Sequence, residues 1–418
     1  MKLSSFTNIK LLKFLQKFLT AILTKLNLKT SITGYSAFQG VDMRHRNLII
    51  AVLITLMPSA LFAATVPLPS TGQNSCHDSA GKEIVCTGTG QDGEQKFGIA
   101  IPSRRLVDNG NGTVTDSLTG LIWLKNADCF GSMTWQQAID SAKSLSNGKC
   151  GLTDRSTTGK WRIPNIVELE SIADLNQHKP ALPTNHPFTN VQISYYWSST
   201  TKADEPVNAW YLYTLQGAAG YAGKYTIKGG VWPVKDGTVS GKIKLPATGQ
   251  AKCYDEIGTA VDCSGTGQDG ELKTGVAWPV PRFKANSNLT ITDNLTGLIW
   301  SQEANSPGPA SCAAEKYMTW QEALEYVACL NRERYLGFSD WRLPNRKEMG
   351  SLTNMGEADN GAWLRAHGFT KAEQNIYWTS TNSAQRFSYG WSSSAGLMST
   401  PSKSSVYNVW PVRGGVKK

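Results

Sequence analysis

The sequence lacks the short motifs by which most enzyme and metal sites are recognised. Its eight cysteines include no C-x-x-C pair, and its five histidines have no metal-ligand spacing. Both facts argue against a zinc site and against thioredoxin-like redox chemistry. The G-x-S-x-G, H-E-x-x-H and phosphate-loop motifs are missing as well. We therefore expect a protein that is not an enzyme, with no catalytic residues, no metal site and no cofactor.

Most of the chain also lacks a strong charge of either sign. The formal net charge is +10, but eight of the 42 Lys and Arg residues and only one of the 32 acidic residues lie in residues 1–63. The remaining chain is nearly balanced. Proteins that bind nucleic acid carry clustered Lys and Arg, so we expect no nucleic-acid partner.

No apolar run is long enough for a confident membrane-spanning helix of about 20 residues. Residues 43–63 instead have the parts of a secretory signal: two arginines, an apolar stretch and small residues at the cleavage site. We expect an exported protein, periplasmic, on the cell surface or secreted, with no stable membrane span in the mature chain. An uncleaved anchor is the alternative. Residues 1–42 are basic and amphipathic, and are either a leader extension or mis-called sequence upstream of a start at Met43.

The chain contains an internal duplication. "TDSLTGLIW" at 115 returns as "TDNLTGLIW" at 292, and "WRIPNIVE" at 161 returns as "WRLPNRKE" at 341. Further repeats, including "MTWQQA" and "YWSST", follow in the same order at offsets of 177 to 185 residues. Such offsets indicate two copies whose loops differ in length. We predict the following organisation: domain one at 71–237, a polar linker at 238–247 and domain two at 248–415.

The cysteines are even in number, which in an exported chain argues for disulfides. Each copy opens with a C-x9-C segment that is typical of a β-hairpin, and a second pair flanks its first helix. The matched positions in the two copies predict four local disulfides: Cys76–Cys86, Cys129–Cys150, Cys253–Cys263 and Cys312–Cys329.

A glycine-rich segment, "GTGQDGE", follows the C-x9-C segment at 88 and again at 265. Its side-chain oxygens suit a hard cation such as calcium. One Asp and one Glu are few ligands, however, so we favour a plain turn and keep calcium as the alternative. "DNGNGTVTD" at 108–116 indicates a hairpin turn, because its counterpart at 284–293 has lost the first Asp and both glycines.

Two helix starts in each copy have the residues of a capping box, in which the first and fourth residues of the motif exchange hydrogen bonds. Trp- and Tyr-rich segments such as "YYWSST" and "AWYLYTL" indicate short strands between turns. The fold class is therefore α+β, with two helices and short antiparallel strands in each domain. The predicted capping pairs are Thr134 with Gln137, Asn165 with Glu168, Thr319 with Glu322, and Asn345 with Glu348.

The motifs T-V-T-D-x-L-T-G-L-x-W, T-W-x-x-A, W-R-x-P-N-x-x-E and Y-W-S-S-T, in this order, resemble the Lcl C-terminal domain, a bacterial domain of unknown function numbered 1566. The resemblance covers nearly all of each copy. More distantly, the helix of T-W-x-x-A followed by W-R-L-P and an acidic helix is similar to the C-type lectin-like and formylglycine-generating folds. The resemblance implies two tandem, disulfide-stapled C-type lectin-like domains and a surface adhesin. The chain has no collagen-like repeat upstream, which argues against a trimeric stalk.

We therefore expect a secreted or cell-surface binding protein, adhesin-like or lectin-like, whose partner is an extracellular glycan or a surface protein. The 14 Trp and 14 Tyr residues offer flat faces for sugar rings, although most should pack in the core. The late loops differ most between the copies, and loops are where binding specialises. The predicted ligand-binding residues are Trp210, Tyr211, Tyr213, Tyr221, Tyr225, Arg386, Tyr389, Trp391 and Tyr407.

The competing interpretation is an extracytoplasmic enzyme of the formylglycine-generating type. That chemistry needs a reactive cysteine pair late in the domain. No cysteine follows Cys150 in domain one or Cys329 in domain two. The sequence therefore favours binding over catalysis.

Overall fold

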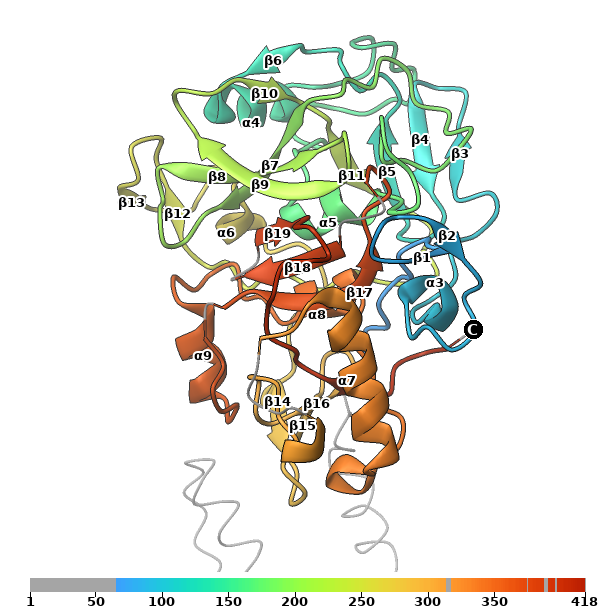
Figure 1. The fold of residues 1–418 in the computed structure, drawn as a ribbon. Coiled ribbons are helices and arrows are strands. Elements are labelled where there is room, and N and C mark those ends of the chain that lie inside the picture. Colours follow the sequence, from blue (N-terminus) through green and yellow to red (C-terminus); the bar gives the residue numbers. More distant parts are fainter. Residues whose placement is uncertain (1–64, 313–316, 374, 387–389, 395–396, 418) are drawn as a thin grey trace, which may run out of the picture. The chain divides into compact units, whose positions relative to one another are not determined.

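The computed structural model describes residues 65–417 except 313–316, 374, 387–389 and 395–396 (Figure 1). The predicted leader extension, the predicted signal peptide and Tyr389 lie outside these residues. The described residues form one compact unit. No described helix is both long enough and apolar enough to cross a membrane.

Copy one, residues 105–237, contains two sheets whose central strands are mostly buried. The first sheet has the order β11-β5-β4-β3 and is antiparallel throughout. Val114 and Trp123 lie opposite each other across it and are fully buried. The turn at 108–116 joins β3 and β4, which confirms the predicted hairpin. The strands are β3 (Leu106–Asp108), β4 (Thr113–Asp116), β5 (Leu121–Leu124) and β11 (Val234–Asp236).

The second sheet of copy one has the order β6-β10-β7-β8-β9. Tyr196 and Trp197 at its centre are buried against the helices and the first sheet. Because adjacent residues on a strand point to opposite faces, this sheet has a core on both sides. Its strands are β6 (Ser132–Met133), β7 (Tyr195–Thr201), β8 (Asn208–Tyr213), β9 (Ala218–Gly223) and β10 (Gly229–Gly230).

Copy two, residues 282–417, repeats this plan with a shorter second sheet. Its first sheet has the order β14-β15-β16-β20, and its second has the order β17-β18-β19. Trp300 and Trp410 replace the buried tryptophans of copy one and meet edge to face. The strands are β14 (Phe283–Ala285), β15 (Thr290–Asp293), β16 (Ile299–Ser301), β17 (Tyr377–Asn382), β18 (Gly390–Ser394), β19 (Leu397–Ser399) and β20 (Val412–Arg413).

All four predicted capping boxes are present at the starts of helices. Thr319 and Asn345, for example, accept from the backbone N–H of the glutamate three residues later, and that glutamate accepts from the N-cap N–H in return. A short helix that copy one does not share, α9 (Asn360–Ala366), follows in copy two. The capped helices are α4 (Trp135–Lys143), α5 (Ile166–Ser171), α7 (Trp320–Arg332) and α8 (Arg346–Ser351).

The repeated W-R-x-P-N-x-x-E segment has the structural role predicted for it. Trp161 and Trp341 are 1% and 2% exposed, and each lies in the core of its copy. The arginine adds a contact that the sequence had not indicated. Arg162 pairs with Glu168 through two hydrogen bonds of 2.6 and 2.8 Å. The capping glutamate is therefore held by both the helix start and the arginine.

The four predicted disulfides all form: Cys76–Cys86, Cys129–Cys150, Cys253–Cys263 and Cys312–Cys329. One expectation about their position is wrong. Cys329 lies inside α7 and not beyond it, because α7 has 13 residues where α4 has nine. The last disulfide therefore ties the final turns of α7 to the short 3-10 turn η2 (Ala310–Cys312).

The C-x9-C segments form two hairpin modules that lie outside the copies. Module one (68–99) contains β1 (Cys76–His77), β2 (Glu83–Ile84) and α3 (Asp92–Gln95). Module two (245–276) contains β12 (Cys253–Tyr254), β13 (Ala260–Val261) and α6 (Asp269–Leu272).

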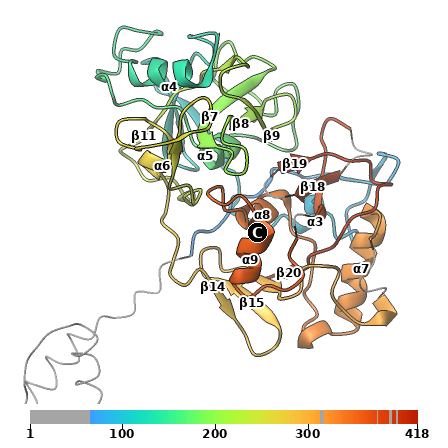
Figure 2. The same cartoon turned by 90° about the vertical axis from the view of Figure 1, so that its left-hand side faces the viewer.

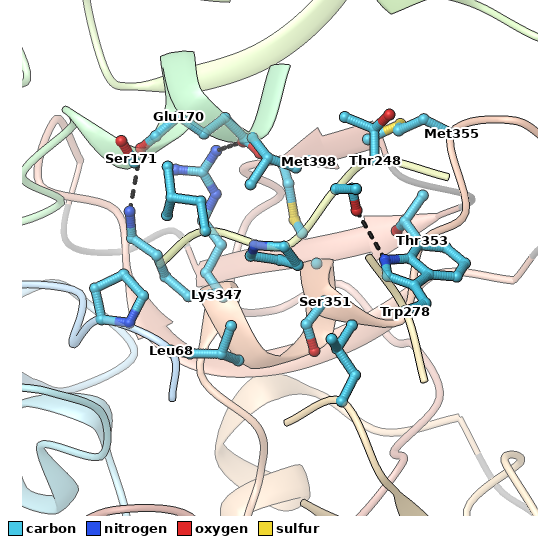
Figure 3. Close-up of a pocket in the computed structure, with 18 residues that line it drawn as sticks. Leu68, Glu170, Ser171, Thr248, Trp278, Lys347, Ser351, Thr353, Met355 and Met398 are labelled. Carbon is cyan, nitrogen blue, oxygen red and sulfur yellow. Dashed lines mark hydrogen bonds and ion pairs between the residues drawn. The ribbon is translucent and has the colours of Figure 1, made fainter. Parts of the chain in front are cut away.

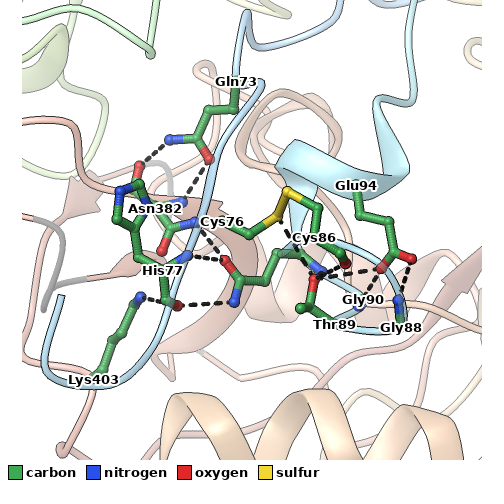
Figure 4. The surroundings of a disulfide bond; sticks show 11 residues. Gln73, Cys76, His77, Cys86, Gly88, Thr89, Gly90, Glu94, Asn382 and Lys403 are labelled. Atoms are coloured by element: carbon green, nitrogen blue, oxygen red, sulfur yellow. Dashed lines mark hydrogen bonds between the residues drawn. A yellow bond between two sulfur atoms is a disulfide. The ribbon is translucent and has the colours of Figure 1, made fainter. Parts of the chain in front are cut away.

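Within each module the glycine-rich segment forms a turn and one turn of helix. Glu94 accepts hydrogen bonds from Gly88 N and Gly90 N, at 2.6 and 2.7 Å. Figure 4 shows this carboxylate folded over the loop beside the Cys76–Cys86 disulfide. The carboxylate of Glu94 thus holds the backbone amides of the loop. The described residues contain no group of three or more His, Cys, Asp or Glu that could hold a metal ion.

The modules and the copies are paired crosswise. Module one precedes copy one in sequence, yet α3 lies against β17 of copy two; α6 of module two lies against β7 of copy one (Figures 1 and 2). The two copies therefore share one compact unit in which each copy is covered by a module that lies outside its own predicted domain. The predicted boundaries at 71–237 and 248–415 stay a prediction.

Candidate binding site

Two of the predicted ligand-binding residues meet on the second sheet of copy one. Trp210 on β8 lies directly opposite Tyr221 on β9. Their rings pack edge to face with centroids 5.8 Å apart. Trp210 is 4% exposed, whereas Tyr221 is 37% exposed. The pair therefore joins a buried indole to a phenol that reaches the solvent.

A pocket of about 170 Å³ opens at this pair of rings. One wall is the turn after β7, with Lys202 and Asp204. The opposite wall comes from copy two, where residues 354–360 lead from α8 to α9. The pocket is thus formed jointly by both copies. Its lining residues are Lys202, Ala203, Asp204, Trp210, Tyr221, Asn354, Met355, Glu357, Ala358 and Asn360.

The buried indole presents a polar group with no internal partner. Trp210 Nε1 is buried, and it has no hydrogen-bond partner among the residues that the structure describes. An unpaired buried donor costs about 1–3 kcal/mol. A ligand oxygen that reached this atom would accept the hydrogen bond and offset the cost.

Charged and amide groups surround the aromatic pair. Lys202 Nζ lies 2.5 Å from Asp204 Oδ2, 3.3 Å from Glu205 Oε2 and 4.5 Å from the centroid of the Tyr221 ring. Burial alone would lower the pKa of Lys202, but the two carboxylates outweigh burial and raise it. Lys202 is therefore a cation at neutral pH, held over the phenol face.

The copy-two wall offers amide groups whose oxygens are already in use. Asn360 Oδ1 accepts from Asn354 N at 2.8 Å, and Asn354 Oδ1 accepts from Gly356 N at 2.9 Å. These bonds fix the orientation of the two amides, so that each side chain retains its NH₂ group as a donor. Glu357 is exposed at the same wall and adds acceptor oxygens.

The other predicted residues of copy one do not line this pocket. Tyr211 and Tyr213 alternate with Trp210 along β8 and pack on Tyr195, with ring centroids 4.4 and 5.0 Å apart. Burial raises the pKa of Tyr211. Tyr225 follows β9 and is 70% exposed. Tyr211 and Tyr213 thus lie with Tyr195 on the opposite face of β8, whereas Tyr225 is an isolated surface residue.

The predicted residues of copy two are not brought together with the pocket. Tyr407 packs on the buried Trp378, with ring centroids 5.0 Å apart, and its backbone pairs with Met318. Arg386 is exposed in the loop after β17. The backbone of Trp391 lies in β18, and its side chain is outside the described set.

A second, smaller pocket lies between α5 and α8 (Figure 3). It has a volume of about 80 Å³ and mainly apolar walls, including Leu68, Trp278 and Met398. Lys347 Nζ donates to Glu170 O at 3.1 Å, and burial, with help from neighbouring arginines, lowers the pKa of Lys347 to about 7. Met355 lines both pockets, so the two lie side by side at the junction of the copies.

The comparisons with known proteins give one family and no individual relative. A family model described as the Lcl C-terminal domain matches residues 112–235 and 289–413. Neither the curated proteins nor the solved structures contain a match. Both matched ranges include the capped helices and the W-R-x-P-N-x-x-E segment, and both leave out the hairpin modules.

Proposed function

Because the chain belongs to the Lcl C-terminal domain family, with two tandem copies, we propose that it is an exported binding protein that recognises a glycan at the pocket of Trp210 and Tyr221. The observation that supports this most directly is that Trp210 lines the pocket while its buried indole N–H has no partner in the described chain. We also infer that the copies are C-type lectin-like, on the order of helices and strands that they share.

The chemistry of the pocket suits a sugar. A sugar ring has apolar C–H faces that pack on aromatic rings and hydroxyl groups that both donate and accept. Tyr221 offers the partly exposed ring, Trp210 and the asparagine amides offer donors, and Asp204 and Glu357 offer acceptors. A volume of about 170 Å³ is below the roughly 300–1,000 Å³ of pockets that enclose drug-sized ligands. One sugar residue at the end of a chain fits this space.

Export is supported by the disulfides. All eight cysteines are paired, and disulfides persist in oxidising compartments such as the periplasm and the cell exterior. The same pairing supports binding over formylglycine-type catalysis, since that reaction needs a reactive thiol.

Glycan-array binding of the exported full-length chain tests the proposal. We expect retention of glycans that share one terminal residue, with the same glycans retained in the presence of a calcium chelator. Binding to protein-coated surfaces with no glycan retained would favour a protein ligand. Retained glycans that are released by the chelator would instead require a cation at the site.

A further inference from the structure

Module one packs on copy two through a set of direct side-chain contacts, some of which Figure 4 shows. We use the name groove two for its docking surface on copy two, which is formed by Thr381, Asn382 and Lys403. Asp92 Oδ2 accepts from Thr71 Oγ1 and from Thr381 Oγ1, both at 2.7 Å. All three side chains are buried. One of the two hydrogen bonds to the buried carboxylate of module one therefore comes from a hydroxyl of copy two.

Two further side chains pair with the backbone across the junction. Gln73 binds both polar backbone groups of Asn382: its Oε1 accepts from the N–H at 2.8 Å, and its Nε2 donates to the carbonyl at 2.5 Å. Lys403 Nζ donates to His77 O and Asp78 O, each at 3.1 Å. The same ammonium lies 3.9 Å from the centroid of the Trp320 ring. The lysine thus connects the hairpin to α7.

Module two docks on the matching surface of copy one, which we call groove one and define by Thr200, Thr201 and Lys224. Thr200 Oγ1 donates to Asp269 Oδ2 at 2.7 Å, and Gln250 binds the N–H and the carbonyl of Thr201 at 2.9 and 2.7 Å. Lys224 Nζ donates to two hairpin carbonyls and lies 4.2 Å from the Trp135 ring. The same residue types recur at both junctions, so the structure contains two independent examples of one docking interaction.

The two modules differ in how they are attached to the rest of the chain. Module two is continuous with copy one on one side and with copy two on the other. Module one is joined to copy one by residues 100–104 only, where Ser103 and Arg104 are exposed and form a turn. Its leading residues also bond copy one, where Leu175 N donates to Thr71 O at 3.0 Å. Each of these contacts of module one is made by a residue that precedes the connection at 100–104.

We propose that module one (residues 68–99) is exchanged between two molecules, so that module one of one molecule occupies groove two of the other. Only the connection at 100–104 changes conformation in such an exchange, and every contact of module one is remade on the second molecule. Exchange of an identical element is a low-cost route to a dimer. A dimer would present two Trp210–Tyr221 pockets and raise the avidity for a multivalent surface.

The junctions also contain differences that direct module one to groove two. Asn382 Nδ2 donates to Gln91 Oε1 at 2.9 Å. The matching residue of groove one is Thr201, which has no side-chain amide to make this bond. Phe97 packs under the Arg342 guanidinium, 3.7 Å from the ring centroid. Module two has Thr274 near this place, and its hydroxyl accepts from Asn165 Nδ2. Exchange therefore joins module one with groove two and not with groove one.

Complementary variants of the full-length chain test the exchange. The module variant carries Gln73→Ala and Asp92→Ala, and the groove variant carries Thr381→Val and Lys403→Met. Each is given a different affinity tag and an intact disulfide set. When the two are mixed, unfolded in denaturant and refolded together, the intact module of the groove variant can occupy the intact groove of the module variant. We expect that purification on the affinity tag of one variant also recovers the other variant. The recovered complex should have twice the mass of one chain by light scattering.

Matched controls distinguish exchange of module one from non-specific association. Each variant refolded alone should stay a monomer. The corresponding pair at the other junction, Gln250→Ala with Asp269→Ala and Thr200→Val with Lys224→Met, should give no mixed dimer, because module two is tethered at both ends. A mixed pair that remains monomeric overturns the proposal, and so does equal dimer formation at both junctions.

The parent chain decides the question if either variant fails to refold. Refolded at rising protein concentration, it should give a dimer fraction that grows with concentration and disappears when module one is crosslinked to its own groove. A parent chain that is monomeric at every concentration overturns the proposal.

Discussion

Arg342 and Glu348 form a two-point ion pair at the start of α8, with N–O distances of 2.6 and 2.7 Å. Both side chains are about 95% buried. Glu348 also accepts from Asn345 N, so a single carboxylate pairs with the arginine and caps the helix. The repeated W-R-x-P-N-x-x-E segment therefore stabilises the fold.

Removing this carboxylate should destabilise the protein strongly. Breaking a buried ion pair by truncating one partner costs about 3–5 kcal/mol, so we expect Glu348→Ala to lower the free energy of unfolding by about that amount in urea titrations. The matched variant Glu168→Ala should cost less, because Arg162 is 12% exposed and has Asp236 as a second partner at 2.9 Å. Equal losses in the two copies would contradict this ranking.

The buried tryptophan of the same segment provides a second test. Trp341 is 2% exposed and packs among the side chains of α7. Truncating a large core side chain leaves a cavity and costs about 3–5 kcal/mol. We expect Trp341→Ala to lose this much in thermal or urea unfolding, whereas Tyr225→Ala at the surface should stay within about 0.5 kcal/mol of the parent. A mild loss at Trp341 would contradict its place in the core.

The docking of the modules should depend on pH. Burial raises the pKa of Asp92 to about 6, although hydrogen bonds from Thr381 and Thr71 oppose the rise; Glu348 and Arg342 are the charged groups nearby. A carboxyl whose pKa is raised in the folded state stabilises below its unfolded pKa, and this stabilisation is lost as the pH rises through about 6. Asp269 at the other junction has the same raised value, also caused mainly by burial.

We therefore expect Asp92→Asn to flatten the pH dependence of unfolding. Between about pH 4 and pH 7 the parent should lose more stability than the variant, by up to roughly 3 kcal/mol for a shift of this size. Urea unfolding at several pH values measures the difference, and Asp269→Asn is the matched variant. If the profiles of the two variants run parallel to that of the parent, the pKa values of these two carboxyls are not raised in the folded state.

Much of the fold could be predicted because its signals are local. Capping boxes need residues three positions apart, and a hairpin disulfide needs cysteines ten positions apart. Because the chain is duplicated, each of these signals occurs twice. Thr134 and Thr319, for example, cap the matching helix in copy one and in copy two. The prediction that the second cysteine pair of copy two flanks this helix was wrong, because α7 extends to Arg332 and so includes Cys329.

The crosswise docking and the binding pocket could not be predicted in this way. Asp92 and Thr381 are 289 positions apart, and nothing in either segment states which copy the module contacts. The pocket combines an aromatic pair that the sequence did indicate with Lys202 and Asn354, which lie in turns without a repeated motif. Only the packing of the two copies brings these side chains together.

The most direct test of the central claim is the affinity of a glycan found on the array for the parent chain and for Trp210→Phe, measured by titration calorimetry. Phe keeps an aromatic ring in the wall but removes the indole N–H. Loss of one hydrogen bond of about 1 kcal/mol predicts a Kd roughly five- to tenfold weaker, with unchanged stoichiometry. Tyr225→Ala, outside the pocket, should bind as the parent does. If Trp210→Phe also binds as tightly as the parent, the pocket at Trp210 and Tyr221 is not the binding site.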